Sequence, residues 1–400
     1  MTRKAHRLRR AALALALAAT LPAHAGDTLG DAFGEGTPVL DVRGRFESVD
    51  DDLFAKDAAA LTLRARLGFR TAAWRGFSAY ADVEGIQGAG KYNDSANGET
   101  QYPTIADPDG EELNALWLGW HAGERTSAVL GRQKFVLDNA RWFGDVAFRQ
   151  NQQTFDALST SFAAGKATIR YAYLDKVHRV FGDDNPNPLL REFDLDAHLV
   201  NASLPIGPVT AVGYGYFVDN QDLPLTSTET FGLRASATHA LTAPWTVAWT
   251  AEAAQQSDWR DGAPVDESYG FAEASVGTPA MRAKLGWERL GGNGVRAVQT
   301  PFATLHAFNG FADRFLTTPP NGLIDAWIGL GGKLGPGDAA LTFHRFDADR
   351  GDAHYGNEWN ASWKATFVQH WDLEIAAARY GADAFSADST KLWLSLGWHY

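Results

Sequence analysis

Apolar and polar residues alternate along most of the chain, in runs of about ten residues that are separated by turns. Residues 61–70, for example, place leucine, alanine and phenylalanine on one face of an extended strand and mostly arginine on the other. Side chains alternate sides along a strand, so this pattern predicts strands with one apolar and one polar face. Such runs start near residues 38, 59, 76, 111, 125, 153, 166, 191, 208, 227, 244, 266, 279, 321, 338, 356, 371 and 390.

The connections between these runs alternate in length. Outer-membrane barrels have short turns on the periplasmic side and long loops on the extracellular side. The predicted fold class is therefore all-β: a single transmembrane antiparallel β-barrel of about eighteen strands, with 16 to 18 as the range. Residues 132–153 fit either a strand or a loop folded into the barrel, and the sequence leaves both open. Short connections lie at 72–76, 122–125, 163–166, 205–207 and 334–338, and long polar ones at 86–111, 176–191, 256–265 and 291–321.

Both ends of the chain carry targeting signals of an exported barrel. Residues 1–25 read as a cleaved signal peptide, with a basic start, an apolar stretch and the small-residue site Ala23-His24-Ala25. Residues 26–37 are expected to form a short periplasmic segment, and residues 38–400 the transmembrane barrel. The last run ends on Tyr400 and looks like the C-terminal signal that the barrel-assembly machinery recognises. The expected location is the bacterial outer membrane, with its lipids and lipopolysaccharide as partners.

Composition and motifs exclude several classes of function. The 400 residues include 36 Lys and Arg against 48 Asp and Glu, and the net charge of -12 argues against a nucleic-acid partner. The absence of cysteine excludes a disulfide scaffold and a Cys-ligated metal site. No G-x-S-x-G, H-E-x-x-H or P-loop motif is present, so we expect neither an enzyme nor a cofactor. We expect no bound metal. The alternative is calcium in the extracellular loops, because Asn93-Asp94 and residues 107–110 offer oxygen ligands.

The polar face of the predicted strands is rich in arginine. An eighteen-stranded barrel is wide enough for an aqueous lumen, so these side chains are expected to line a pore. Arginine matches carboxylates and phosphates with two hydrogen bonds, and a ladder of arginines would favour anionic solutes. The alternative is that inward charges neutralise one another and set no preference. The predicted pore-lining residues on the strands are Arg43, Arg45, Arg64, Arg66, Asp82, Glu84, Arg170, Arg282, Lys284 and Glu288.

Two segments resemble the alginate-export family of outer-membrane barrels. The first runs from Gly131-Arg132-Gln133 to Thr154-Phe155-Asp156, and the second covers residues 299–325 with Pro301-Phe302 and Asn309-Gly310-Phe311. The resemblance implies an eighteen-stranded porin that passes or exports an anionic saccharide of the alginate type, with an arginine-lined constriction. By the same resemblance, the constriction or gate residues would be Arg132, Asp138, Arg141, Arg149 and Asp156.

The segment 299–323 is too long and too apolar for a solvated loop. Its phenylalanines require burial, so we expect it to fold into the barrel mouth as a gate; the alternative is packing against neighbouring loops. The expected gate residues are Phe302, Phe308, Phe311, Asp313 and Arg314. The predicted function is transmembrane transport by an anion-selective channel for an acidic polysaccharide or oligosaccharide. A general small-solute diffusion porin is the alternative, and the sequence does not decide between the two.

Overall fold

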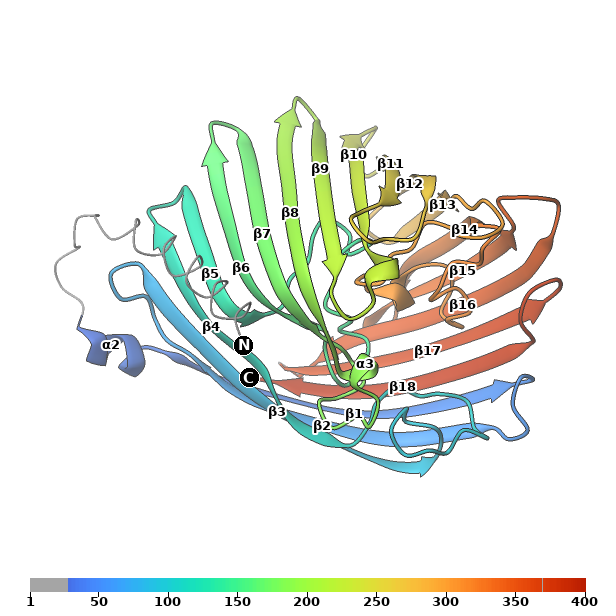
Figure 1. Cartoon of the computed structure of the whole chain (residues 1–400), viewed down its shortest axis with the longest axis horizontal. Helices are drawn as coiled ribbons and strands as arrows, with labels where there is room; N and C mark the ends of the chain where they lie inside the picture. Colours follow the sequence, from blue (N-terminus) through green and yellow to red (C-terminus); the bar gives the residue numbers. More distant parts are fainter. Residues whose placement is uncertain (1–27, 369) are drawn as a thin grey trace.

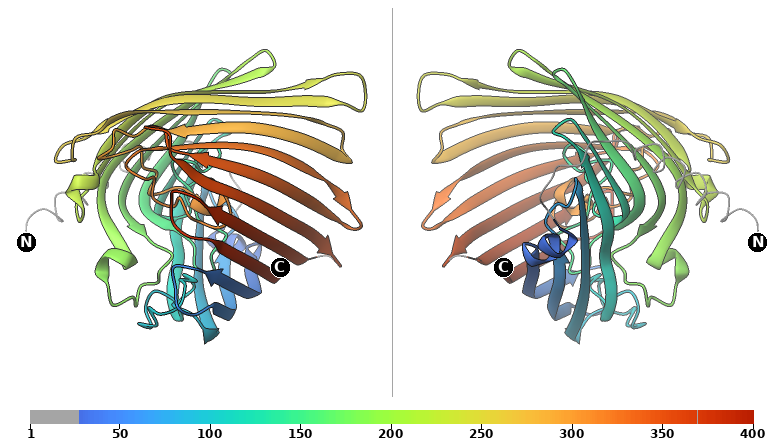
Figure 2. Two further views of the ribbon diagram at one scale, coloured as in Figure 1. Left: turned by 90° about the vertical axis from the view of Figure 1, so that its right-hand side faces the viewer. Right: turned by 90° about the vertical axis from the view of Figure 1, so that its left-hand side faces the viewer.

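Eighteen strands form one antiparallel sheet that closes into a barrel, because β18 pairs with β1 as well as with β17. Figures 1 and 2 show the ring of strands from three sides. The computed structural model describes residues 28–368 and 370–400, so the predicted signal peptide lies outside the described residues. The strands are β1 (Thr37–Asp51), β2 (Ala58–Arg70), β3 (Phe77–Lys91), β4 (Gly110–Ala122), β5 (Thr126–Gln133), β6 (Thr154–Ala164), β7 (Ala167–His178), β8 (Glu192–Ile206), β9 (Val209–Asn220), β10 (Thr228–Ala240), β11 (Thr246–Asp258), β12 (Asp266–Gly277), β13 (Met281–Leu290), β14 (Leu323–Leu334), β15 (Gly337–Asp347), β16 (His354–Phe367), β17 (Trp371–Ala382) and β18 (Ser389–His399).

The predicted fold class is confirmed, and each predicted strand start lies within about two residues of an observed one. Among the described residues the helices are few and short: α2 (Leu29–Gly34), α3 (Pro188–Arg191) and the 3₁₀ turns η1 (Pro224–Thr226) and η2 (Leu305–Ala307). Within the described part of the chain, no helix has the length and apolar character that a membrane crossing requires.

The outer face of the barrel is apolar and the inner wall is polar, as the alternation predicts. Leu233 and Leu67 are 71% and 62% exposed on the outside, whereas Arg64 and Glu84 on the inside are 4% and 3% exposed. A closed barrel with an apolar exterior is stable in lipid, where every backbone group is paired within the sheet. The architecture therefore places the chain in the bacterial outer membrane.

Two loop boundaries and one strand start from the sequence require correction. The segment expected as a long loop at 86–111 is shorter, because β3 continues to Lys91 and β4 begins at Gly110. The expected loop at 256–265 is shorter as well, because β11 continues to Asp258. In both places the strand continues, with its backbone paired, beyond the part that shows the apolar and polar alternation. A pattern of hydrophobicity cannot detect these strand ends. The N-terminal segment contains α2, and β1 begins at Thr37 rather than 38.

The longest connections fold into the barrel instead of away from it. Residues 134–153 follow β5, and residues 291–322 join β13 to β14; both lie inside the ring of strands (Figure 1). This settles the alternative at 132–153: β5 ends at Gln133, and the remainder is an inward-folded loop. Aromatic residues of both loops, including Trp142, Phe143 and Phe302, form a packed core inside the lumen.

Leu233→Arg places a charge at the middle of β10 on the outer face, and we expect it to lower the free energy of unfolding in lipid by about 2–4 kcal/mol. Leu241→Arg, in the turn after β10, is the matched control and should cost about 0–1 kcal/mol. Urea-induced unfolding in lipid vesicles measures both. Equal losses for the two variants would contradict a lipid-facing β10.

Candidate functional site: the lumen constriction

Residues 134–153, here called the strap, cross the lumen from β5 to the opposite wall. Arg141 forms an ion pair with Glu288 of β13, with Nε 2.9 Å from Oε1. The indole N–H of Trp142 donates to Glu252 of β11 at 3.0 Å. Asp138 accepts a hydrogen bond from Asn201 of β8 at 2.8 Å. These contacts hold the tip of the strap against the β8–β13 side of the barrel.

The returning half of the strap lies against β1 and β2, where four of the five arginines of these strands donate to it. Arg43 donates to the carbonyl oxygen of Ala147 at 3.0 Å, and Arg45 to that of Phe148. Arg64 donates to the Gln150 carbonyl at 3.2 Å, and Arg66 to the Gln152 side chain at 2.9 Å. This arginine ladder therefore lies on the inner wall, and its side chains have protein partners there.

Carboxylates on the wall pair with the two ladder arginines of β2. Arg64 pairs with Asp41, and Arg66 pairs with Glu84 and lies 3.4 Å from Asp82. Hydrogen bonds to charged groups are stronger than neutral ones, and buried charges persist only where partners are present. The ladder and its acids thus anchor the strap to the wall.

Gln150 connects the strap to both strands of the ladder. Its side chain is fully buried, accepts from Arg43 Nε at 2.8 Å and donates to the Thr62 hydroxyl at 2.9 Å. Its backbone N–H donates to Asp107 of the β3–β4 loop at 2.7 Å. The strap is consequently held from the wall below and from an extracellular loop above.

Residues 291–322, here called the gate loop, pack onto the strap inside the barrel mouth. Phe302 stacks on Phe143 with ring centroids 5.7 Å apart, and the backbones of these two residues form a bridge. Phe308 lies beneath the guanidinium of Arg141, and the Phe311 ring stacks on His306. The loop predicted as a gate is therefore folded into the lumen.

Charged residues fasten the end of the gate loop. Asp313 lies 3.2 Å from Lys391 of β18 and 2.8 Å from His306, and Arg314 pairs with Asp51 of β1 at 2.8 Å. Burial alone would raise the pKa of Asp313. The charges of Lys391, His306 and Arg149 outweigh burial and hold that pKa well below its ordinary value.

The predicted constriction residues fall into separate groups. Arg149 of the strap pairs with Glu47 at 3.1 Å and belongs to the strap anchor. Arg132 and Asp156 pair with each other at 3.1 Å on β5 and β6, beside the constriction. Three of the predicted pore-lining residues on the strands take no part in the contacts with the strap. Arg170 is exposed on β7, Arg282 bonds to Ser275 and Thr246, and Lys284 lies 3.8 Å from Glu273.

A cavity of about 400 Å³ opens between the strap and the gate loop at the extracellular mouth. Its apolar lining comes from several loops and includes Phe181, Leu305 and Leu316. The charged lining comprises four cations against two acids, which gives a formal excess of two positive charges. These residues are Arg149, Arg179, Arg314 and Lys391 against Asp51 and Asp313.

Arg179 is the lining cation that sequence reasoning missed. It follows β7 directly, and its guanidinium lies 4.9 Å and 4.7 Å from the rings of Phe181 and Phe193. It donates to the Leu189 carbonyl at 2.6 Å, and it pairs with no carboxylate among the described residues. Burial lowers the pKa of Arg179 to about 10, so the side chain stays charged at neutral pH. The one sequence signal for Arg179 is its position in the long 176–191 connection, which is expected on the extracellular side.

The loops considered for calcium direct their oxygens to the protein. Asp94 accepts from the backbone N–H groups of Ala96 and Asn97, both at 2.7 Å, and Asp107 accepts from Gln150. Residues 28–368 and 370–400 contain no group of three or more acidic or histidine side chains placed to hold a metal ion.

Comparison with known proteins yields matches in structure and none in sequence. No protein-family model and no curated protein matches the chain. Among solved structures, Acinetobacter baumannii OccAB4 is 13% identical with a TM-score of 0.69, and the match covers 91% of this chain and 98% of that one. Pseudomonas aeruginosa OpdO is 13% identical with a TM-score of 0.71, covering 93% and 98%. Pseudomonas aeruginosa OccK9 (OpdG) is 12% identical with a TM-score of 0.71, covering 92% and 99%.

These similarities confirm the barrel fold over nearly the full length of the chain. The resemblance to the alginate-export family, and the specificity that it implies, stays a prediction.

Gln150→Ala removes the buried link between the strap and the ladder, and we expect a loss of about 1–3 kcal/mol in the stability of the strap. The strap should then be cut by trypsin at least several-fold faster than in the parent protein. Gln221→Ala serves as the control, because Gln221 is an exposed residue of the β9–β10 loop whose side chain donates to Asp219 at the end of β9 and does not contact the strap. Unchanged cleavage in Gln150→Ala would show that the ladder does not hold the strap.

Proposed function

We propose that the protein is an outer-membrane diffusion channel for small solutes, and that it favours small organic anions over cations. The mouth cavity carries this proposal. Its volume of about 400 Å³ lies within the range of sites for small molecules, about 300–1,000 Å³. A polysaccharide chain would need a wider continuous path, whereas the strap and the gate loop meet inside the lumen through Phe143 and Phe302. The diffusion channel is therefore favoured over the polysaccharide exporter.

The preference for anions rests on the charges that surround the cavity. Arg149, Arg314 and Lys391 each pair with an acid, so their field is largely cancelled at short range. Arg179 has an aromatic environment and a carbonyl partner instead, which leaves its charge available to a passing solute. One such cation in a narrow, partly apolar site favours entry of an anion without binding it so tightly that release is slow.

The apolar part of the lining suits the body of an organic solute. Phe181, Leu305 and Leu316 line the same cavity as the cations. A small organic anion could place its charged group near Arg179 and its carbon skeleton against these side chains, as is common in small-molecule sites. The ladder arginines act in this scheme as anchors of the strap, and their effect on the solute is indirect.

Arg179→Gln should lower the anion-to-cation permeability ratio of the refolded channel by a factor of about two to five, because it removes the cavity cation that lacks an acidic partner. The reversal potential across a planar bilayer under a salt gradient measures this ratio. The single-channel conductance should change little, since the strap and the gate loop keep their contacts.

Arg260→Gln is the matched control. Arg260 lies in the β11–β12 loop, pairs with Asp196 and Asp219, and does not line the cavity. A wild-type channel without anion preference, or an equal shift in both variants, would contradict the proposed selectivity.

A further inference from the structure

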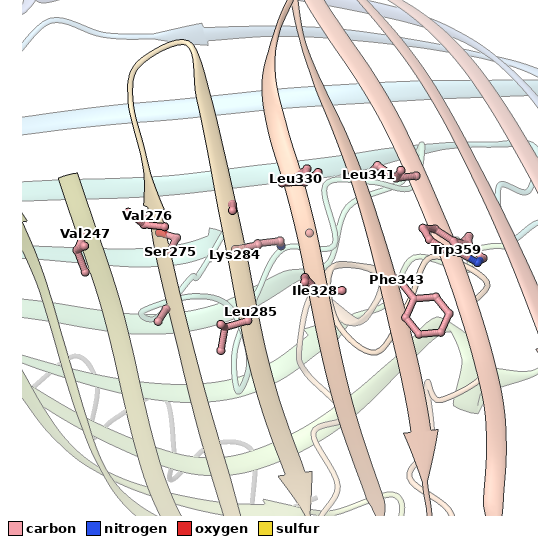
Figure 3. A pocket seen from close by; sticks show the side chains of 13 residues that line it. Val247, Ser275, Val276, Lys284, Leu285, Ile328, Leu330, Leu341, Phe343 and Trp359 are labelled. Atoms are coloured by element: carbon pink, nitrogen blue, oxygen red, sulfur yellow. The ribbon is translucent and has the colours of Figure 1, made fainter. Parts of the chain in front are cut away.

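An apolar groove of about 420 Å³ crosses the outer face of the barrel from β11 to β16 (Figure 3). Two cross-strand rows of side chains form it. In one row Trp359, Phe343, Ile328 and Leu285 lie directly opposite one another on successive strands. Small residues such as Ala283 lie between larger side chains in these rows. Its lining residues are Val247, Ala274, Ser275, Val276, Ala283, Lys284, Leu285, Ile328, Gly329, Leu330, Leu341, Phe343 and Trp359.

The groove faces the lipid and not the lumen. Leu285 and Ile328 are 63% and 62% exposed, and they belong to the outward rows of β13 and β14. Lys284 belongs to the inward row, where its ammonium lies 3.8 Å from Glu273. An apolar channel of this kind on a lipid-facing surface matches the shape and chemistry of an acyl chain.

Two arginines lie next to the end of the groove that is formed by Phe343 and Trp359. Arg379 of β17 is the direct cross-strand partner of Trp359, and Arg345 lies two residues beyond Phe343 on the same face of β15. Both strands end shortly afterwards, at Asp347 and Ala382, on the extracellular side. These arginines are therefore at the level of the outer-leaflet headgroups.

The two arginines differ in their partners. Arg345 forks onto Asp347 with distances of 2.8 Å and 3.1 Å and is 57% exposed. The side chain of Arg379 is exposed and forms no hydrogen bond or ion pair with any of the described residues. A charged side chain on the lipid face costs free energy unless it reaches water or a polar headgroup. An anionic headgroup would supply the partner that Arg379 lacks.

We propose that this groove and Arg379 form a binding site for a phosphorylated lipid of the outer leaflet, the lipid anchor of lipopolysaccharide. One acyl chain lies in the groove between Phe343 and Ala283, and a phosphate group binds Arg379, with Arg345 beside it. Guanidinium and phosphate form charge-assisted, two-pronged hydrogen bonds, which explains the position of a cation at the end of an apolar groove. The site is independent of the proposed transport function.

Native mass spectrometry of the detergent-solubilised barrel with purified lipid A tests the headgroup. We expect one lipid A bound per barrel, about tenfold weaker binding in Arg379→Gln, and wild-type binding in Arg350→Gln. Arg350 is an exposed arginine of the β15–β16 loop that bonds to the Asn293 carbonyl, so it controls for net charge. Dephosphorylated lipid A should bind the parent and Arg379→Gln equally. Equal binding of both lipids by the parent protein would overturn the proposal.

Ala283→Leu fills the groove and tests the acyl chain. It should weaken binding of phosphorylated and dephosphorylated lipid A by several-fold, while a leucine on the lipid face is compatible with the barrel. Ala274→Leu, on the neighbouring strand, repeats the test at a second position. Both leucine variants could instead bind phosphorylated lipid A as tightly as the parent protein does. That result would show that the groove does not hold the lipid, and it would also overturn the proposal.

Discussion

The arrangement of the lumen depends on hydrogen bonds from the buried arginines of β1 and β2 to the strap. Arg45 and Arg64 are almost fully buried, so their charges need partners that replace water. Strap carbonyls supply acceptors from one side, and wall carboxylates such as Asp41 and Glu84 supply negative charge from the other. Removing either set would leave a buried cation uncompensated, which is far more costly than losing an ordinary surface ion pair.

The other features of the lumen follow from a strap that is fixed in place. Phe143 and Trp142 at its tip are directed towards the far wall, where tyrosines of β9 and β12 surround them. The gate loop then packs on this aromatic platform through Phe302, and its end is fastened by Asp313 and Arg314. The mouth cavity is the space that remains between the two loops, so its size is set by the anchoring on β1 and β2.

The fold could be predicted from the sequence because the membrane imposes one rule on every strand. The alternation of apolar and polar residues located each of the eighteen strands. The pattern has few exceptions, because one face of every strand contacts lipid and the other forms the polar inner wall. The inward phase of Arg43 and Arg64 was predictable for the same reason. Their partners were not, because Arg43 and Gln150 are separated by 107 positions along the chain and no local pattern links them. Arg179 and the outer groove were missed because each depends on how distant loops or strands come together in space.

The central claim is that the anchored strap and gate loop narrow a barrel of eighteen strands to the scale of small solutes. Single-channel recording of the wild-type protein with neutral polyethylene glycols of increasing size tests it most directly, because polymers that enter the lumen lower the conductance. The structure predicts that only the smallest polymers, with dimensions close to a cavity of about 400 Å³, reduce the current. An unobstructed barrel of this width would admit much larger polymers. A fall in conductance with those larger polymers would contradict the account.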